Sequence, residues 1–224
     1  AENYLVVMKF TYYQMKVSQG GRIGMEYDST DPAKSSQEPL KTMFGDLLAL
    51  EIKMEFDAKG DVVSASGTEA YFETLAKDPA LAPQLPAMKK VLSNKELARG
   101  IQASKAMLPV KPVTIDDTWP VTIDNGQGAM KGTATLYEVV TTPQGELATI
   151  KLKGTVDKFP NQPGVTFESA KVTFEGTIRM YVATGMMVDY VVKLGGPMAM
   201  TAQGQSMNID MDMDMKMTMT PAKQ

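Results

Sequence analysis

The chain has 224 residues, a formal net charge of -3 from 23 Lys+Arg and 26 Asp+Glu, and neither histidine nor cysteine. Its near-neutral charge, without a basic run interleaved with aromatic residues, argues against nucleic acid as a partner. The missing residue types remove the commonest general base, the thiolate nucleophile and zinc sites built on imidazole or thiolate. We therefore expect a protein that is not an enzyme and has no cofactor. No stretch approaches the roughly 20 apolar residues of a transmembrane helix.

The N-terminal part of the chain is rich in strand-forming residues. Residues 4–17 (YLVVMKFTYYQMKV) contain many β-branched and aromatic side chains, and predict a long strand. Gly20-Gly21 predicts a turn into a short return strand at residues 23–27. The polar segment 28–39 is expected to be a loop, followed by a short helix over residues 40–48.

A hairpin and a helical segment are predicted next. Residues 50–56 alternate between apolar and polar types, and Asp57–Gly60 would turn the chain into a second strand at residues 61–66. From Gly67 the apolar period changes from two to about 3.6, which predicts a helical insert over about residues 68–108.

The rest of the chain is predicted to be strands and turns. The expected strands cover residues 130–141, 146–157, 170–182, 186–194 and 206–220, with 198–201 as an added strand or part of a hairpin arm. Pro143–Gly145, residues 160–164, Thr184-Gly185 and Gly195–Pro197 are expected to separate them. Such short connections cannot carry parallel crossovers, so the strands should form an antiparallel meander. We predict one α+β domain over residues 1–224, a strongly curved sheet or incomplete barrel with the helical insert packed against it.

The most distinctive feature is the strand predicted at residues 206–220. One face would carry Met207, Ile209, Met211, Met213, Met215, Met217 and Met219. The other face would carry Asn208, three aspartates, Lys216 and two threonines. Such alternation is typical of a strand with one face buried and the other in solvent.

Two interpretations of this methionine face compete. Thioethers suit copper(I), but same-face residues on one strand lie about 6.8 Å apart, so convergence on one ion needs bending or a second strand. The flexible side chains can instead fill a core or line an apolar cavity, which we favour. The candidate ligand-binding residues are Met207, Met211, Met213, Met215, Met217, Met219, Met54 and Met180. We predict no metal ligands.

The acidic clusters fit structural roles better than catalytic ones. Asp210, Asp212 and Asp214 imitate the start of a calcium-binding EF-hand loop, but Met215 and Pro221 stand where that loop needs Gly and Glu. Asp116-Asp117 are adjacent in an extended setting, so their side chains would point apart and could not flank a substrate.

Several segments, read in order, resemble a bacterial family known only as a domain of unknown function. They are residues 4–17, 25–29 (MEYDS), 55–60, 108–119 and 146–150, together with the alternating C-terminal strand. Its members carry a signal peptide or lipoprotein signal and long Met- and Thr-rich strands. The resemblance implies a periplasmic, outer-membrane-associated or secreted location. Strands upstream of residue 3 are also expected in that family, so a chain lacking them would leave a sheet edge open.

Three functions follow from these patterns, in decreasing order of support. The first is a non-catalytic cell-envelope protein that binds an apolar ligand, such as a lipid or lipopeptide, in a Met-lined sheet interior. The second is a structural or assembly protein in which the first or last strand is an open edge that pairs with another chain, giving a homo-oligomer. The third is copper(I) binding through methionine.

Overall fold

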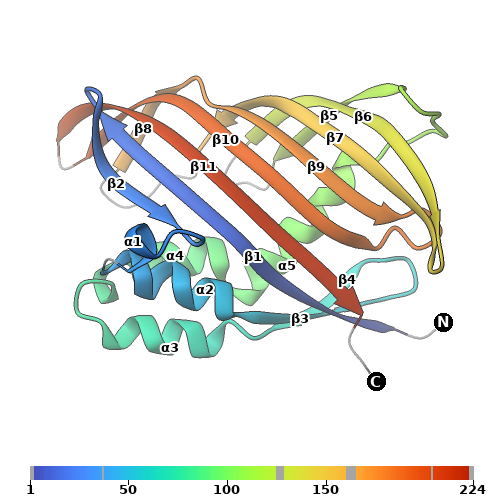
Figure 1. Cartoon of the computed structure of the whole chain (residues 1–224), viewed down its shortest axis with the longest axis horizontal. Helices are drawn as coiled ribbons and strands as arrows, with labels where there is room; N and C mark the ends of the chain where they lie inside the picture. The colour runs from blue at the N-terminus through green and yellow to red at the C-terminus, as the bar shows by residue number, and fades with distance from the viewer. Residues whose placement is uncertain (1–2, 37, 125–128, 160–164, 203, 222–224) are drawn as a thin grey trace.

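The protein is built on one open antiparallel sheet that curves over a layer of helices (Figure 1). The computed structural model describes residues 3–36, 38–124, 129–159, 165–202 and 204–221. Its strands are β1 (Tyr4–Gln19), β2 (Arg22–Asp28), β3 (Glu51–Phe56), β4 (Val62–Ser66), β5 (Thr118–Asp124), β6 (Ala129–Thr142), β7 (Gly145–Lys158), β8 (Val165–Ala170), β9 (Thr173–Tyr181), β10 (Met187–Ala202) and β11 (Gln205–Pro221).

The strand order places the first and the last strand next to each other in the interior of the sheet. The order is β4-β3-β1-β11-β10-β9-β7-β6-β5, with β2 also paired to β1 and β8 to β10. The path does not close into a barrel, and β4 and β5 are its outer strands. The α+β, mainly antiparallel, strongly curved sheet expected from the sequence is therefore confirmed.

The helices lie beneath one part of the sheet (Figure 1). They are α1 (Pro32–Ser35), the π-helical turn η1 (Lys41–Gly45), α2 (Asp46–Ala49), α3 (Glu69–Lys77), η2 (Ala82–Gln84), α4 (Leu85–Leu92), α5 (Asn94–Ser104) and η3 (Lys105–Met107). The elements α3 to η3 coincide with the predicted insert over residues 68–108. The helix expected at residues 40–48 is also present, as η1 and α2.

The predicted loop at residues 28–39 and the predicted turn at Gly195–Pro197 are both wrong. The segment 28–39 is not wholly a loop, because Asp31 caps the short helix α1 by accepting a hydrogen bond from the Ala33 N–H, with Pro32 at the first helical position. Gly195–Pro197 is not a turn but part of β10, where these residues pair with residues 210–212 of β11.

The strand predicted at 170–182 is two strands in the structure. β8 ends at Ala170 and β9 begins at Thr173. Between them the Lys171 N–H donates to the Pro197 carbonyl at 3.0 Å, so the chain stays attached to β10 while it changes strand. The loop predicted at residues 160–164 lies outside the described residues.

The expectation that the first or last long strand is an open edge is also wrong. β1 pairs with β11 from Val6↔Pro221 to Ser18↔Asp210, and has β3 and β2 on its other side. β11 in turn pairs with β10 along most of its length. Both strands are interior, so the structure removes the observation on which the assembly alternative rested.

The buried side chains form two clusters along the concave face. The first joins β1, β2, β3 and β11 to the helices, with Met8, Ile52, Met54, Leu75 and Leu81 fully buried. The second lies under β5, β6, β7, β9 and β10, around Ala134, Ile150, Phe174 and Ile178. The methionine face of β11 runs across both clusters and joins them.

Glycines let the second half of the sheet curve tightly. Gly132 on β6 lies directly opposite Gly154 on β7, and Gly154 lies opposite Phe174 on β9. A Cβ atom on Gly154 would lie 2.7 Å from Cε1 of Phe174 and 2.6 Å from Cα of Gly132. The buried Phe174 ring therefore fills the space that the two glycines leave, which allows close strand approach at this bend.

Replacing Gly154 with alanine should lower the free energy of unfolding by about 1–3 kcal/mol, the usual cost of overpacking. Gly100→Ala is the matched control, because Gly100 lies within α5 with no atom near its Cβ position; it should stabilise the protein by up to about 1 kcal/mol. Urea denaturation measures both. Equal stability of the Gly154 variant and the parent would contradict this account of the bend.

Candidate functional site

The methionine face of β11 is present as predicted. Met217 and Met219 are buried, Met207 to Met215 are partly buried at alternate positions, and Asp210 and Asp212 are exposed. Pairing with β1 and β10 on both sides fixes this orientation. The face therefore looks toward the helices, and the aspartates look toward solvent.

The eight candidate methionines do not converge on one site. Met54, Met217 and Met219 belong to the first core cluster, and Met180 belongs to the second. The partly buried ones are divided: Met213 and Met215 pack on the first cluster, Met211 and Met215 on the second, and Met207 lies opposite Met200 on β10. Most of the face is thus core packing.

One small hollow lies on the inner side of the sheet, between the two core clusters. It is partly open to solvent, is lined in part by Tyr4, Met180, Met187 and Met219, and has a volume of about 50 Å³. That space holds one or a few water molecules, and is far below the 300–1,000 Å³ of small-molecule sites. This hollow alone is therefore too small for the apolar ligand that the sequence suggests.

A larger apolar groove lies between the helices and the sheet. Its volume is about 660 Å³. It is lined by Phe10, Tyr13, Met43, Phe44, Leu47, Tyr71, Pro83, Gln84, Pro86, Ala87, Met88, Val91, Leu92 and Met215. We call this the ligand groove. None of these side chains carries a charge at neutral pH, and only Met215 was among the candidates named from the sequence.

The local sequence explains how the ligand groove forms. Pro86 lies in the first turn of α4, where proline is tolerated, and Met88, Val91 and Leu92 follow at the i, i+3, i+4 spacing that places side chains on one helix face. Opposite them, the Tyr13 ring of β1 stacks on Phe44 with 4.4 Å between centroids. One wall is therefore an adaptable helix surface and the other is a rigid aromatic surface.

The two tyrosines of the groove are neutral at physiological pH. Burial raises the pKa of Tyr13 to about 12, and burial also raises the pKa of Tyr71, with Asp46 adding to the shift. The Tyr71 hydroxyl donates to the Met43 carbonyl at 3.0 Å, so its proton is used within the protein. The groove thus offers an apolar surface with few polar groups, which suits an uncharged apolar ligand.

Most of the groove could not be found by scanning for methionine-rich strands. Phe10 and Tyr13 were predicted only as part of a long strand, and Met88 lies in a segment interrupted by two prolines. The signal that was available is the apolar spacing of Met88, Val91 and Leu92.

A second open hollow, of about 730 Å³, lies at the end of the sheet near Tyr181. Unlike the ligand groove, it is lined in part by a charged side chain, that of Glu146.

A helical bridge, defined as α5 and η3 (residues 94–107), lies between the two outer strands of the open sheet. It packs on β4 on one side and on β5 on the other. On the β5 side the Trp119 Nε1–H donates to the Met107 carbonyl at 2.8 Å. The bridge therefore covers the gap that would otherwise expose two strand edges.

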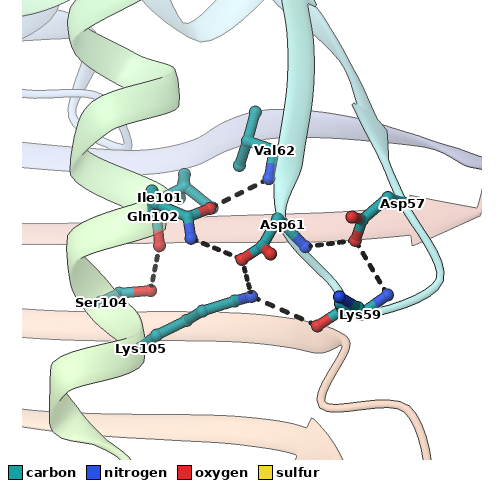
Figure 2. Close-up of polar contacts among 8 residues, drawn as sticks. All are labelled: Asp57, Lys59, Asp61, Val62, Ile101, Gln102, Ser104 and Lys105. Atoms are coloured by element: carbon teal, nitrogen blue, oxygen red, sulfur yellow. Dashed lines mark hydrogen bonds and ion pairs between the residues drawn. The ribbon is translucent and has the colours of Figure 1, made fainter.

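Polar contacts fix the other side of the bridge to the β3–β4 turn, as Figure 2 shows. The Gln102 side chain accepts from the Val62 N–H at 2.9 Å and donates to Asp61 at 2.7 Å. Lys105 Nζ lies 2.5 Å from the same Asp61 carboxylate and 3.3 Å from the Lys59 carbonyl. Within the turn, Asp57 accepts from the Lys59 and Asp61 N–H groups. The Gln102 side chain thus supplies a hydrogen-bond acceptor for the backbone N–H of Val62, on the outer strand β4.

Asp117, one of the adjacent pair weighed above for catalysis, and the buried Asp189 both hold hydrogen bonds within the protein. Asp117 accepts from the Thr114 N–H and hydroxyl at 2.7 and 2.9 Å, and these hydrogen bonds lower the pKa of Asp117. Asp189 is buried on β10 and is paired with Arg179 on β9. Among the described residues, no group of three or more Asp, Glu, His or Cys side chains could hold a metal ion.

The Asp61 contacts should make stability depend on pH. Hydrogen bonds from Lys105 and then Gln102 lower the pKa of Asp61 below its usual 3.8. This stabilisation is complete above pH 3.8 and is lost as the pH falls through the lower folded-state value. The difference in melting temperature between the parent and Asp61→Asn should therefore shrink as the pH is lowered from 7 to about 2.5. A difference in melting temperature that does not change with pH would contradict a stabilising role of the Asp61 carboxylate.

We expect the Gln102 side chain to stabilise the outer strand β4. Gln102→Ala should lower the free energy of unfolding by about 1–3 kcal/mol, because the half-buried Val62 N–H loses its acceptor. The Val62 amide should also exchange faster in hydrogen-exchange NMR. The control is Lys95→Ala on the exposed face of α5, which should change neither quantity. Unchanged exchange at Val62 in the Gln102 variant would contradict the contact.

The comparisons with known proteins are consistent with the resemblance read from the sequence. A family model described as "Family of unknown function (DUF6263)" matches residues 1–223. No curated protein and no solved structure matches the chain. In the part of the chain that the structure describes, no helix is both long and apolar enough to cross a membrane. Because the model spans nearly the whole sequence, the chain belongs to the DUF6263 family, whose function is unknown.

Proposed function

We propose that this protein is a non-catalytic cell-envelope protein that binds an apolar ligand in the ligand groove. The observation that carries the proposal is an open space of about 660 Å³ lined by uncharged, mainly apolar side chains. A space of this size and lining is typical of small-molecule sites. The cell-envelope location rests on the resemblance stated above and is part of the proposal.

The lining favours the apolar chain of a lipid or lipopeptide over a compact polar metabolite. Gln84 is the one side chain of the lining with an amide, and Tyr13 and Tyr71 direct their hydroxyls at protein atoms. An acyl chain needs no hydrogen-bonding partner, whereas a buried polar metabolite does. A charged head group would have to stay outside the groove. Met43, Met88 and Met215 can adjust to chains of different shape.

Burial also predicts how affinity depends on chain length. Each methylene moved from water into an apolar site contributes about 0.8 kcal/mol, or roughly a fourfold change in Kd. Uncharged monoacylglycerols of increasing chain length should therefore bind with steadily increasing affinity until the groove is filled. This dependence distinguishes binding by burial from binding through a head group.

Filling the groove should abolish this binding. Ala87→Trp places a large ring in the groove, so the Kd for a monoacylglycerol should rise by more than about tenfold, equivalent to at least two lost methylenes. Displacement of the fluorescent probe N-phenyl-1-naphthylamine measures the Kd. Ala76→Trp, on the exposed face of α3, is the matched control and should bind like the parent.

Circular dichroism and the melting temperature show whether both variants remain folded. If the parent binds neither probe nor monoacylglycerol, or if Ala87→Trp and Ala76→Trp bind equally well, the groove is not the ligand site. A parent that retains affinity for short and long chains alike would also contradict binding by burial.

A further inference from the structure

The second open hollow lies where β10 turns away from β11. β11 pairs with β1 as far as Val6↔Pro221, but its pairing with β10 ends at Asp189↔Thr218. Residues 219–221 therefore have β1 on one side, while none of the described residues of β10 pairs with them on the other. The β6–β7 and β9–β10 turns lie at the same end of the sheet (Figure 1). We call the space between these turns and residues 219–221 the strand-end hollow.

Backbone hydrogen bonds hold the turns that border the strand-end hollow. The Val182 N–H, at the β9–β10 turn, donates to the Glu146 carbonyl at 2.9 Å, which joins that turn to the start of β7. Within the turn, the Tyr181 N–H donates to the Met186 carbonyl at 2.9 Å, and the Met186 N–H donates to the Thr184 hydroxyl at 3.2 Å. The hydrogen-bonded backbone therefore fixes Glu146, Tyr181 and Met186 relative to one another.

The lining of the strand-end hollow is mainly apolar and includes a single charged residue. The volume of about 730 Å³ is within the range of small-molecule sites. Among the described residues that line it, Glu146 is the one with a charge at neutral pH. The apolar part of the lining includes Leu5, Tyr181, Met186, Val188, Met219 and Pro221.

The Glu146 carboxylate is available to a ligand. Its residue is exposed, and none of the described residues forms an ion pair or a side-chain hydrogen bond with it. No lysine or arginine is among the described residues of the lining, so its negative charge is not compensated there. Opposite charges attract more strongly beside an apolar surface than in bulk water. The hollow therefore favours a cation and repels an anion of the same shape.

We propose that the strand-end hollow binds an apolar cation, such as an amphiphile with one ammonium group. The apolar part lies against Tyr181 and Met186, and the ammonium group lies at Glu146. Burial of the apolar part supplies most of the affinity, and the ion pair selects the sign of the charge. The ligand groove and the strand-end hollow share no lining residue, so either site can be present without the other.

Decylammonium and decanoate, which have the same chain length and opposite charge at neutral pH, test the site below their micelle concentrations. In ¹H–¹³C NMR spectra of the methionine methyl groups, Met186 and Met219 report the strand-end hollow, and Met43, Met88 and Met215 report the ligand groove. The Kd for decylammonium, measured at Met186 and Met219, should be about two- to fivefold lower than that for decanoate, the range of exposed ion pairs. Absence of saturable shifts at Met186 and Met219, or equal Kd values, would overturn the proposal.

Charge variants separate the Glu146 carboxylate from the net charge of the protein. Glu146→Gln should make the two Kd values nearly equal, and Glu146→Lys should reverse their order. Glu73→Lys, at an exposed position of α3, changes the net charge by the same amount and should keep the preference for decylammonium. Circular dichroism and the melting temperature show that each variant is folded. A preference that survives in Glu146→Lys, or that is lost equally in Glu73→Lys, would overturn the proposal.

Discussion

The pairing of β1 with β11 is the contact on which the rest of the structure depends. It joins residues about 200 positions apart in sequence, and it places the strands from both ends of the chain at the centre of the sheet. The two core clusters meet along β11, whose partly buried methionines contact both. Loss of this ladder would separate the helix-covered half of the sheet from the curved C-terminal half.

The open sheet is completed by a helix instead of a further strand. The helical bridge covers both outer strands, with Gln102 satisfying a backbone donor of β4 and Met107 accepting from Trp119 of β5. Closure by side chains leaves the interior less regular than that of a barrel. The ligand groove occupies the resulting space between helices and sheet, while the sheet interior is packed by methionine and aromatic side chains.

Much of the fold could be predicted from the sequence because its strands alternate and its turns are short. The alternation over residues 206–220 correctly predicted which face of β11 is buried. Gly195–Pro197 was misread as a turn, because glycine and proline within a long paired strand look locally like a hairpin loop. The position of β1 beside β11 could not be predicted, since no local pattern encodes pairing between the ends of a chain.

The candidate site was harder to predict than the fold. Of the eight methionines named from the sequence, Met215 lines the ligand groove, while Met54 and Met180 are core residues. The groove is made by five helical elements and two strands, so its lining is scattered over residues 10–92 and 215. Single-strand periodicity identifies a buried face, but it does not show whether helices pack tightly against that face.

The most direct test of the central claim is a methionine-methyl NMR titration of the protein with monodecanoylglycerol. If the ligand groove is the binding site, the signals of Met43, Met88 and Met215 will shift together and saturate, and the signals of Met54 and Met180 will stay fixed. Absence of shifts at the three groove methionines, or shifts centred on other methionines, would contradict the account.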